Sequence, residues 1–239
     1  ARSALNDNLM NADVVYASGE NVNSGANANS GIMAHGSFTA TNQANGVIYA
    51  DGKGGYVSGL ATVYGGAATV LNEGAIYVRG GAGKNYLKTK GISVDDGTAR
   101  NTGTIVVEKG TGMVSNSQGN SDKNIIENAG IIEVHSGFGM VDNKGSSGFA
   151  GEGSGVSIIN TGHISVDGQY SMAVFVGEDS KNGTTTITNS GTISANGEDG
   201  SYAISVAATD HAVDISLEGN SKIDGQIYIH GCTNQTTLT

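Results

Sequence analysis

The heptapeptide Asn160-Thr161-Gly162-His163-Ile164-Ser165-Val166 is the strongest indication of the fold, because related phrases return at nearly constant intervals along the chain. Clear copies begin at residues 72, 101, 128, 160 and 189, and weaker copies begin at residues 44 and 219. The clear copies are separated by 29, 27, 32 and 29 residues. A period of this length is typical of a solenoid, in which each coil packs only against its neighbours.

The composition favours short strands joined by tight turns. The 239 residues include 39 glycines, no proline and no tryptophan. Glycine and asparagine tolerate turn conformations, and the apolar residues are mainly valine and isoleucine, which suit strands. The formal net charge of −10 argues against nucleic acid or an anionic membrane as a partner. No apolar run reaches the length of about 18 residues that a membrane helix needs.

The unit from residue 160 to residue 189 shows how one coil is built. It holds three apolar segments, at residues 163–166, 172–176 and 184–188, each followed by a polar turn. Three strands and three turns predict an all-β fold, a triangular parallel β-helix of about 29 residues per coil. We expect residues 1–28 to form an N-terminal cap or an irregular first coil, residues 29–231 the β-helix, and residues 232–239 a frayed end.

Alternation along the first strand predicts which side chains point inward. One interior column comprises Ile76, Ile105, Ile132, Ile164, Ile193 and Ile223. The phrase itself supplies asparagines that can hydrogen-bond from coil to coil, and glycines where a Cβ would obstruct the turn. This structural turn column comprises Asn72, Gly74, Asn101, Gly103, Asn128, Gly130, Asn160, Gly162, Asn189 and Gly191.

Two departures from the regular coil are candidate binding segments, because loops on a rigid scaffold often carry binding groups. Residues 79–100 hold five of the twelve basic residues and a tyrosine, namely Arg79, Lys84, Tyr86, Lys88, Lys90 and Arg100. They could bind an anionic glycan or the acidic flank of a second copy, or they could be solvated turn residues on different edges. Residues 143–155 form an insertion with Phe149, which either packs back on the rod or contacts a partner.

The sequence offers no constellation that predicts catalysis. The acidic pairs Asp95-Asp96 and Glu198-Asp199 lie in glycine-rich turns, where neighbouring carboxylates usually face water. Glycoside hydrolysis needs two carboxyl groups that converge across one bond, and a metal site needs several converging ligands. We therefore expect no enzyme activity, no metal and no cofactor. Cys232 is the one cysteine, which is either a free thiol or the partner of a cysteine outside this sequence.

The repeated Asn-x-Gly-x-Ile-x-Val phrase, in a proline-free chain rich in Gly, Asn, Ser and Thr, resembles the passenger domains of bacterial autotransporters, the type V secretion proteins. The AIDA-type self-associating adhesins are the most similar group, and the resemblance covers about residues 29–231. It implies a right-handed β-helix, displayed outside the cell at the bacterial outer-membrane surface, of which this chain is an excised piece.

The resemblance also implies a function. We expect a surface adhesin that promotes aggregation and biofilm formation through lateral contacts between copies on neighbouring cells. The alternative is an adhesin that binds host glycans or extracellular matrix. A polysaccharide-active enzyme and a passive stalk are further readings. Neither nucleic acid nor membrane insertion is expected of this chain.

Overall fold

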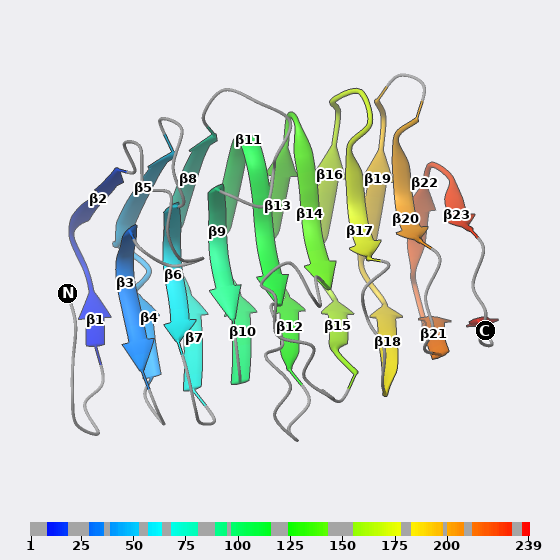
Figure 1. Cartoon of the computed structure of the whole chain (residues 1–239), viewed down its shortest axis with the longest axis horizontal. Coiled ribbons are helices and arrows are strands. Elements are labelled where there is room, and N and C mark those ends of the chain that lie inside the picture. The colour runs from blue at the N-terminus through cyan, green and yellow to red at the C-terminus, as the bar shows by residue number, and fades with distance from the viewer. Residues whose placement is uncertain are drawn as a thin grey trace.

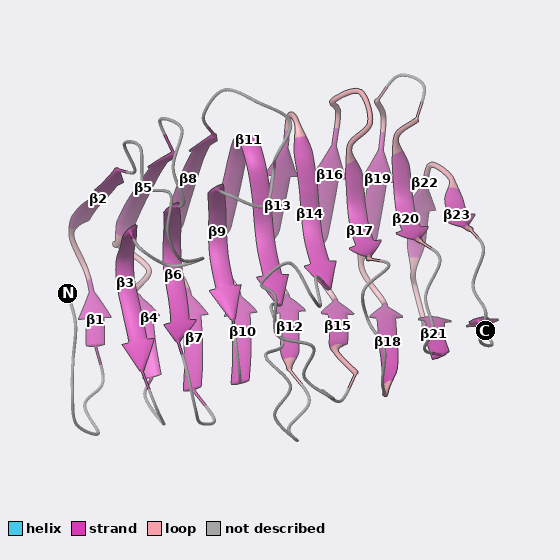
Figure 2. Ribbon diagram, in the orientation of Figure 1, coloured by secondary structure: helices cyan, strands magenta, loops and turns pink. Residues whose placement is uncertain are grey.

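The computed structural model describes residues 9–18, 29–35, 39–52, 57–63, 68–80, 89–94, 97–115, 124–142, 155–177, 183–197, 200–207, 212–230 and 236–239. Every regular element in these ranges is a β-strand (Figure 2). The same ranges contain no helix that is long and apolar enough to cross a membrane.

The strands wind into a solenoid with three faces. In Figure 1 the chain climbs at the back and descends at the front while it advances from left to right. This sense of winding is right-handed. All paired strands are parallel and come from successive coils. The prediction of an all-β parallel solenoid with three strands per coil is therefore confirmed.

Each face collects one strand from every coil. Face 1 follows the asparagine phrase and contains β2 (Val14–Ser18), β5 (Val47–Gly52), β8 (Ala75–Gly80), the start of β11 (Thr104–Ser115), β13 (Ile131–Val134), β16 (His163–Val166), β19 (Thr192–Ala195) and β22 (Lys222–Asp224). Face 2 contains β3 (Asn29–His35), β6 (Val57–Val63), β9 (Thr89–Val94), the end of β11, β14 (Gly137–Asp142), β17 (Met172–Val176), β20 (Tyr202–Val206) and β23 (Ile227–Ile229). Face 3 contains β1 (Leu9–Asn11), β4 (Thr39–Asn42), β7 (Ala68–Asn72), β10 (Gly97–Asn101), β12 (Ile125–Asn128), β15 (Ser157–Asn160), β18 (Thr184–Asn189), β21 (Ala212–Leu217) and β24 (Thr236–Leu238).

The interior is built from columns of aliphatic side chains in strict register. Ile105 pairs with Ile76 on one side and with Ile132 on the other, and the column continues through Ile164 and Ile193. All five side chains are fully buried. Burial of an isoleucine contributes about 1.5–3 kcal/mol, so stability comes from stacking coils rather than from any single coil.

The asparagines of the phrase form a buried ladder at the corner between face 3 and face 1. Each side-chain amide nitrogen donates to the amide oxygen of the next coil, with Nδ2–Oδ1 distances of 2.7–2.9 Å. The ladder runs from Asn11 through Asn42, Asn72, Asn101, Asn128 and Asn160 to Asn189. Asn189 then donates to Ser221 Oγ at 2.6 Å. The asparagine column therefore has a structural role.

The glycines of the phrase are required by close approach between coils. A Cβ on Gly103 would overlap the carbonyl oxygen of Gly74, and a Cβ on Gly130 would overlap that of Gly103. Gly162 and Gly191 stand in the same relation to the coil before them. None of these glycines has a positive φ, so the constraint is the space between coils rather than backbone handedness.

Strand pairing is present within residues 1–28, the range expected to form a cap or an irregular first coil, and it continues past residue 231. β1 and β2 pair in register with β4 and β5, so coil structure is already present at Leu9. β24 pairs with β21 at the other end. Residues 29–32, which resemble half a phrase, lie in β3 on face 2 and pair with β6. Cys232 lies outside the described residues.

Candidate functional site

The described basic residues of the 79–100 segment lie on three different faces of the solenoid. Arg79 is exposed at the end of β8 on face 1, and Arg100 lies in β10 on face 3, where its Nε is 3.3 Å from Glu127 Oε1. Lys90 lies in β9 on face 2 and is only 2% exposed, and its Nζ donates to Ser93 Oγ at 3.4 Å. These three cations therefore do not form one exposed patch. Lys84, Tyr86, Lys88 and Phe149 lie outside the described residues.

A row of exposed tyrosines on face 1 is the clearest surface feature of the described chain. Tyr16, Tyr49 and Tyr77 occupy equivalent outward positions on β2, β5 and β8. The ring centroids of Tyr16 and Tyr49 are 4.9 Å apart, and those of Tyr49 and Tyr77 are 5.2 Å apart, with nearly parallel planes. Because the rings stack on one another, they present their edges and hydroxyl groups to solvent rather than the faces between them.

The sequence places this row by simple alternation. Ile48 and Ile76 point inward, so the next residue in each coil, Tyr49 or Tyr77, must point outward. The following coils continue the same column with Val106 and then Glu133. Large apolar side chains are thus exposed over the first three coils, and exposed aromatic patches commonly mark an interaction site.

A second row runs parallel to the tyrosines, two residues further along each strand. Asp51 pairs in register with Arg79, and Arg79 Nε lies 2.9 Å from Glu108 Oε2. The hydrogen bond and the charge of Glu108, together with the charge of Asp51, raise the pKa of Arg79. Arg79 therefore stays positively charged, with both carboxylates acting on it.

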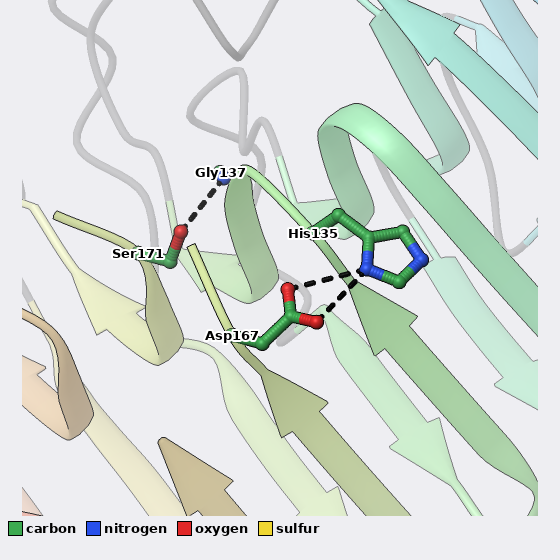
Figure 3. A network of polar contacts seen from close by, with 4 residues as sticks. All are labelled: His135, Gly137, Asp167 and Ser171. Carbon is green, nitrogen blue, oxygen red and sulfur yellow. Dashed lines mark hydrogen bonds and ion pairs between the residues drawn. The ribbon is translucent and has the colours of Figure 1, made fainter. Parts of the chain in front are cut away.

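The second row continues at the corner after β13. His135 Nδ1 lies 3.0 Å from Asp167 Oδ2 and 3.2 Å from Asp167 Oδ1 (Figure 3). Figure 3 also shows Ser171 accepting a hydrogen bond from the backbone amide of Gly137, at 3.1 Å. Both contacts join successive coils, so they fix the turn that carries His135 beside the end of the row.

The two rows border a groove of about 500 Å³. It is lined by Tyr16, Tyr49, Ala50, Asp51, Tyr77, Val78, Arg79, Val106, Glu108 and His135. We call this surface the tyrosine groove. Its size lies within the range of small-ligand sites, and its lining combines apolar ring edges with hydrogen-bonding groups.

The chemistry of the groove suits binding. Its charged side chains are largely exposed, with 69% exposure for Arg79 and 63% for Glu108, whereas catalytic acids and bases are usually set apart by burial. Among the described residues, no group of three or more His, Cys, Asp or Glu side chains is placed to hold a metal ion. The two histidines on these neighbouring coils, His135 and His163, are not at matching positions, because His163 pairs with Ile131. The acidic pairs at residues 95–96 and 198–199 lie outside the described residues.

The sequence predicts the inward isoleucine column, including Ile76, but it does not by itself group the residues of the groove. The available signal was a tyrosine directly after the inward isoleucine in two neighbouring coils, Ile48-Tyr49 and Ile76-Tyr77. Tyr16 follows Val15 in place of an isoleucine, and no full copy of the repeated phrase precedes it, so the sequence does not align Tyr16 with the other two tyrosines. Asp51, Glu108 and His135 could not be grouped without the register. Comparison of the chain with family models, with curated proteins and with solved structures gave no match.

Proposed function

We propose that this protein is the binding region of a bacterial surface adhesin, and that the tyrosine groove is its contact site for an extended glycan. The main support for this proposal is the row of exposed tyrosines beside the groove. The resemblance of the repeat phrase to autotransporter passengers supports display outside the cell. The role assigned to the groove is binding without chemical change.

The shape of the groove favours a narrow ligand over a second copy of the same surface. A symmetric dimer uses the same patch on both partners, so that patch must be self-complementary. Two copies of a hollow placed face to face would leave a void between them. A slender polymer can instead enter the groove and contact both bordering rows.

The composition of the groove also matches a sugar chain. Pyranose rings carry apolar C–H groups on their faces and hydroxyl groups at their edges. The phenol rings of Tyr16, Tyr49 and Tyr77 offer apolar edges together with hydroxyl groups, and Asp51 and Arg79 offer an acceptor and a donor. Each sugar unit could therefore pair its polar groups while it covers apolar surface.

A panel of immobilised oligosaccharides tests this function. We expect the wild-type chain to bind members of the panel, and the triple variant Tyr16→Ala/Tyr49→Ala/Tyr77→Ala to lose that binding. Tyr228→Ala is the matched control, because Tyr228 on face 2 is 42% exposed and stacks on Tyr202 in the same manner. If the triple variant bound glycans as tightly as the wild-type chain, the groove would not be the binding site. If the wild-type chain bound no glycan, the proposed function would be wrong.

Self-association is the second candidate, and a separate surface favours it. Face 3 carries a row of half-buried hydroxyl side chains at matching positions, interrupted once by Ile125. The row comprises Thr39, Thr69, Thr98, Ser157 and Thr186. A neighbouring rod has the same spacing between coils, so weak contacts along this face could add up.

Sedimentation over a wide range of protein concentration separates the two candidates. Reversible dimers that disappear in Thr69→Lys/Thr98→Lys would support face 3 as a contact between copies. The groove variants should leave such dimers intact. A chain that stays monomeric at every concentration would contradict self-association and leave glycan binding as the proposed function.

A further inference from the structure

The tyrosine groove runs along the solenoid axis, across the strands. Its lining comes from β2, β5, β8 and β11 and from His135 just after β13, which are five successive coils of face 1. The two bordering rows are two residues apart on each strand, a separation of about 7 Å. An occupant must therefore be a narrow chain that lies parallel to the axis and meets one coil after another.

The contacts along this channel repeat once per coil. Parallel strands are spaced by about 4.8 Å, and the tyrosine centroids follow at 4.9 and 5.2 Å. One pyranose unit of an extended 1,4-linked chain advances by a similar distance. An extended peptide rises by only about 3.3 Å per residue, so successive residues would not keep step with coils that are about 4.8 Å apart.

The charges of the groove select against an anionic ligand. The lining contains the carboxylates of Asp51 and Glu108 and one guanidinium, that of Arg79. Arg79 is already bonded to Glu108, and the whole chain carries a formal net charge of −10. A polyanion would meet repulsion, and no unpaired cation among the described lining residues offsets it.

An ammonium-bearing ligand is also disfavoured. Both lining carboxylates act on Arg79, so a ligand cation beside either of them would lie near that guanidinium. The same groups still have lone pairs and N–H groups to offer to neutral hydroxyls. The balance of charge within the groove thus favours an uncharged occupant.

We infer that the tyrosine groove binds a linear, uncharged hexopyranose chain laid along the solenoid axis, with one sugar unit per coil. This inference rests on the proposed glycan-binding function and names its ligand class and its orientation. The tyrosine edges and hydroxyl groups contact one side of the chain, and Asp51, Arg79 and Glu108 hydrogen-bond to hydroxyl groups on the other side.

Isothermal titration with a length series of neutral oligomers tests the inference, using β-1,4-linked glucose oligomers, which are extended, from the disaccharide to the hexasaccharide. Affinity should rise by about tenfold or more between the disaccharide and the pentasaccharide, and then level off, because the groove spans five coils. An oligogalacturonate of the same length, in which each unit carries a carboxylate, should bind at least about tenfold more weakly.

The position of the substitution gives a second test. Tyr49 is the middle ring of the row. Tyr49→Ala should therefore reduce the increase in affinity between the disaccharide and the pentasaccharide. Tyr49→Phe should retain most of the rise because it keeps the ring, and Tyr228→Ala should not change it.

The outcomes separate the inference from the function on which it rests. An affinity that is independent of length, or tighter binding of the oligogalacturonate, would overturn the ligand class while glycan binding stood. Binding of charged or branched glycans on the panel, with no binding of any linear neutral hexopyranose oligomer, would also overturn this ligand class. Failure of every glycan on the panel would instead overturn the proposed function.

Discussion

The ring of Tyr49 stacks on that of Tyr77 at a centroid distance of 5.2 Å, although the two residues belong to successive coils. The spacing of the rings follows the spacing of the strands that carry them. A feature repeated at one position of the coil thus becomes a continuous surface along the rod. The asparagine ladder is the buried counterpart, because Asn101 lies between Asn72 and Asn128 in the same way.

Replacing Asn101 should destabilise the whole stack. Its amide nitrogen donates to Asn128 Oδ1 and its amide oxygen accepts from Asn72, and the side chain is fully buried. Asn101→Ala removes one ladder hydrogen bond to each neighbouring coil and takes the Asn101 donor away from the buried Asn128 Oδ1, so we expect a loss of about 3 kcal/mol in the free energy of unfolding. Urea denaturation measures it. Thr161→Ala, at the exposed position after Asn160 in a later coil, is the control, and an equal loss in the two variants would contradict the ladder's role.

Gly103→Ala should cost more than Gly219→Ala, for different physical reasons. A Cβ at Gly103 would overlap the carbonyl oxygen of Gly74, whereas a Cβ at Gly219 meets nothing within 4 Å. Gly219 has a φ of 56°, so alanine there carries only backbone strain of about 1–2 kcal/mol. Thermal unfolding of the two variants should rank them in this order. The reverse order would show that coil spacing does not fix the glycine of the phrase.

Removing Arg79 should weaken glycan binding without unfolding the protein. The guanidinium is exposed and its ion pair with Glu108 lies in solvent, where such pairs contribute little to stability. We expect Arg79→Ala to keep the wild-type melting temperature and to lose about tenfold in glycan affinity. Arg100→Ala is the matched control, because Arg100 pairs with Glu127 on face 3. Equal losses of affinity in both variants would argue against a site on face 1.

The chain should not be retained by an anionic polymer. The described cations of the 79–100 segment are spread over three faces, and Arg79 and Arg100 are each paired with a glutamate. On a heparin column we expect elution at low salt, with no change after charge reversal at Lys84 and Lys88. Retention that survives moderate salt and is abolished by that reversal would instead support the anionic-glycan interpretation of the segment.

The sequence predicts the coil well because its strongest signals are local and repeated. The spacing from Asn101 to Asn128 and the alternation around Ile105 and Ile132 predict the strands, the inward columns and the corner. The same signals fail near Leu9, where β1 and β2 carry no full copy of the phrase and only pairing with β4 and β5 identifies them as a coil.

The groove was harder to predict because its residues depend on the register between coils. Arg79 and Lys90 are eleven positions apart and both basic, so the sequence suggests one patch. Arg79 lies in β8 on face 1, whereas Lys90 lies in β9 on face 2 and is buried. Tyr16 and Tyr77 are far apart in sequence, yet they border one groove.

Protection of tyrosines from nitration by tetranitromethane, with mass spectrometry to assign each modified residue, shows whether a glycan occupies the tyrosine groove. Tyr16, Tyr49 and Tyr77 are exposed in the groove, and Tyr170 and Tyr228 are exposed outside it. With a neutral β-1,4-linked glucose pentasaccharide present, we expect slower nitration of the three groove tyrosines and unchanged nitration of the other two. Equal rates at all five residues with and without a pentasaccharide shown to bind would contradict the tyrosine groove as the binding site.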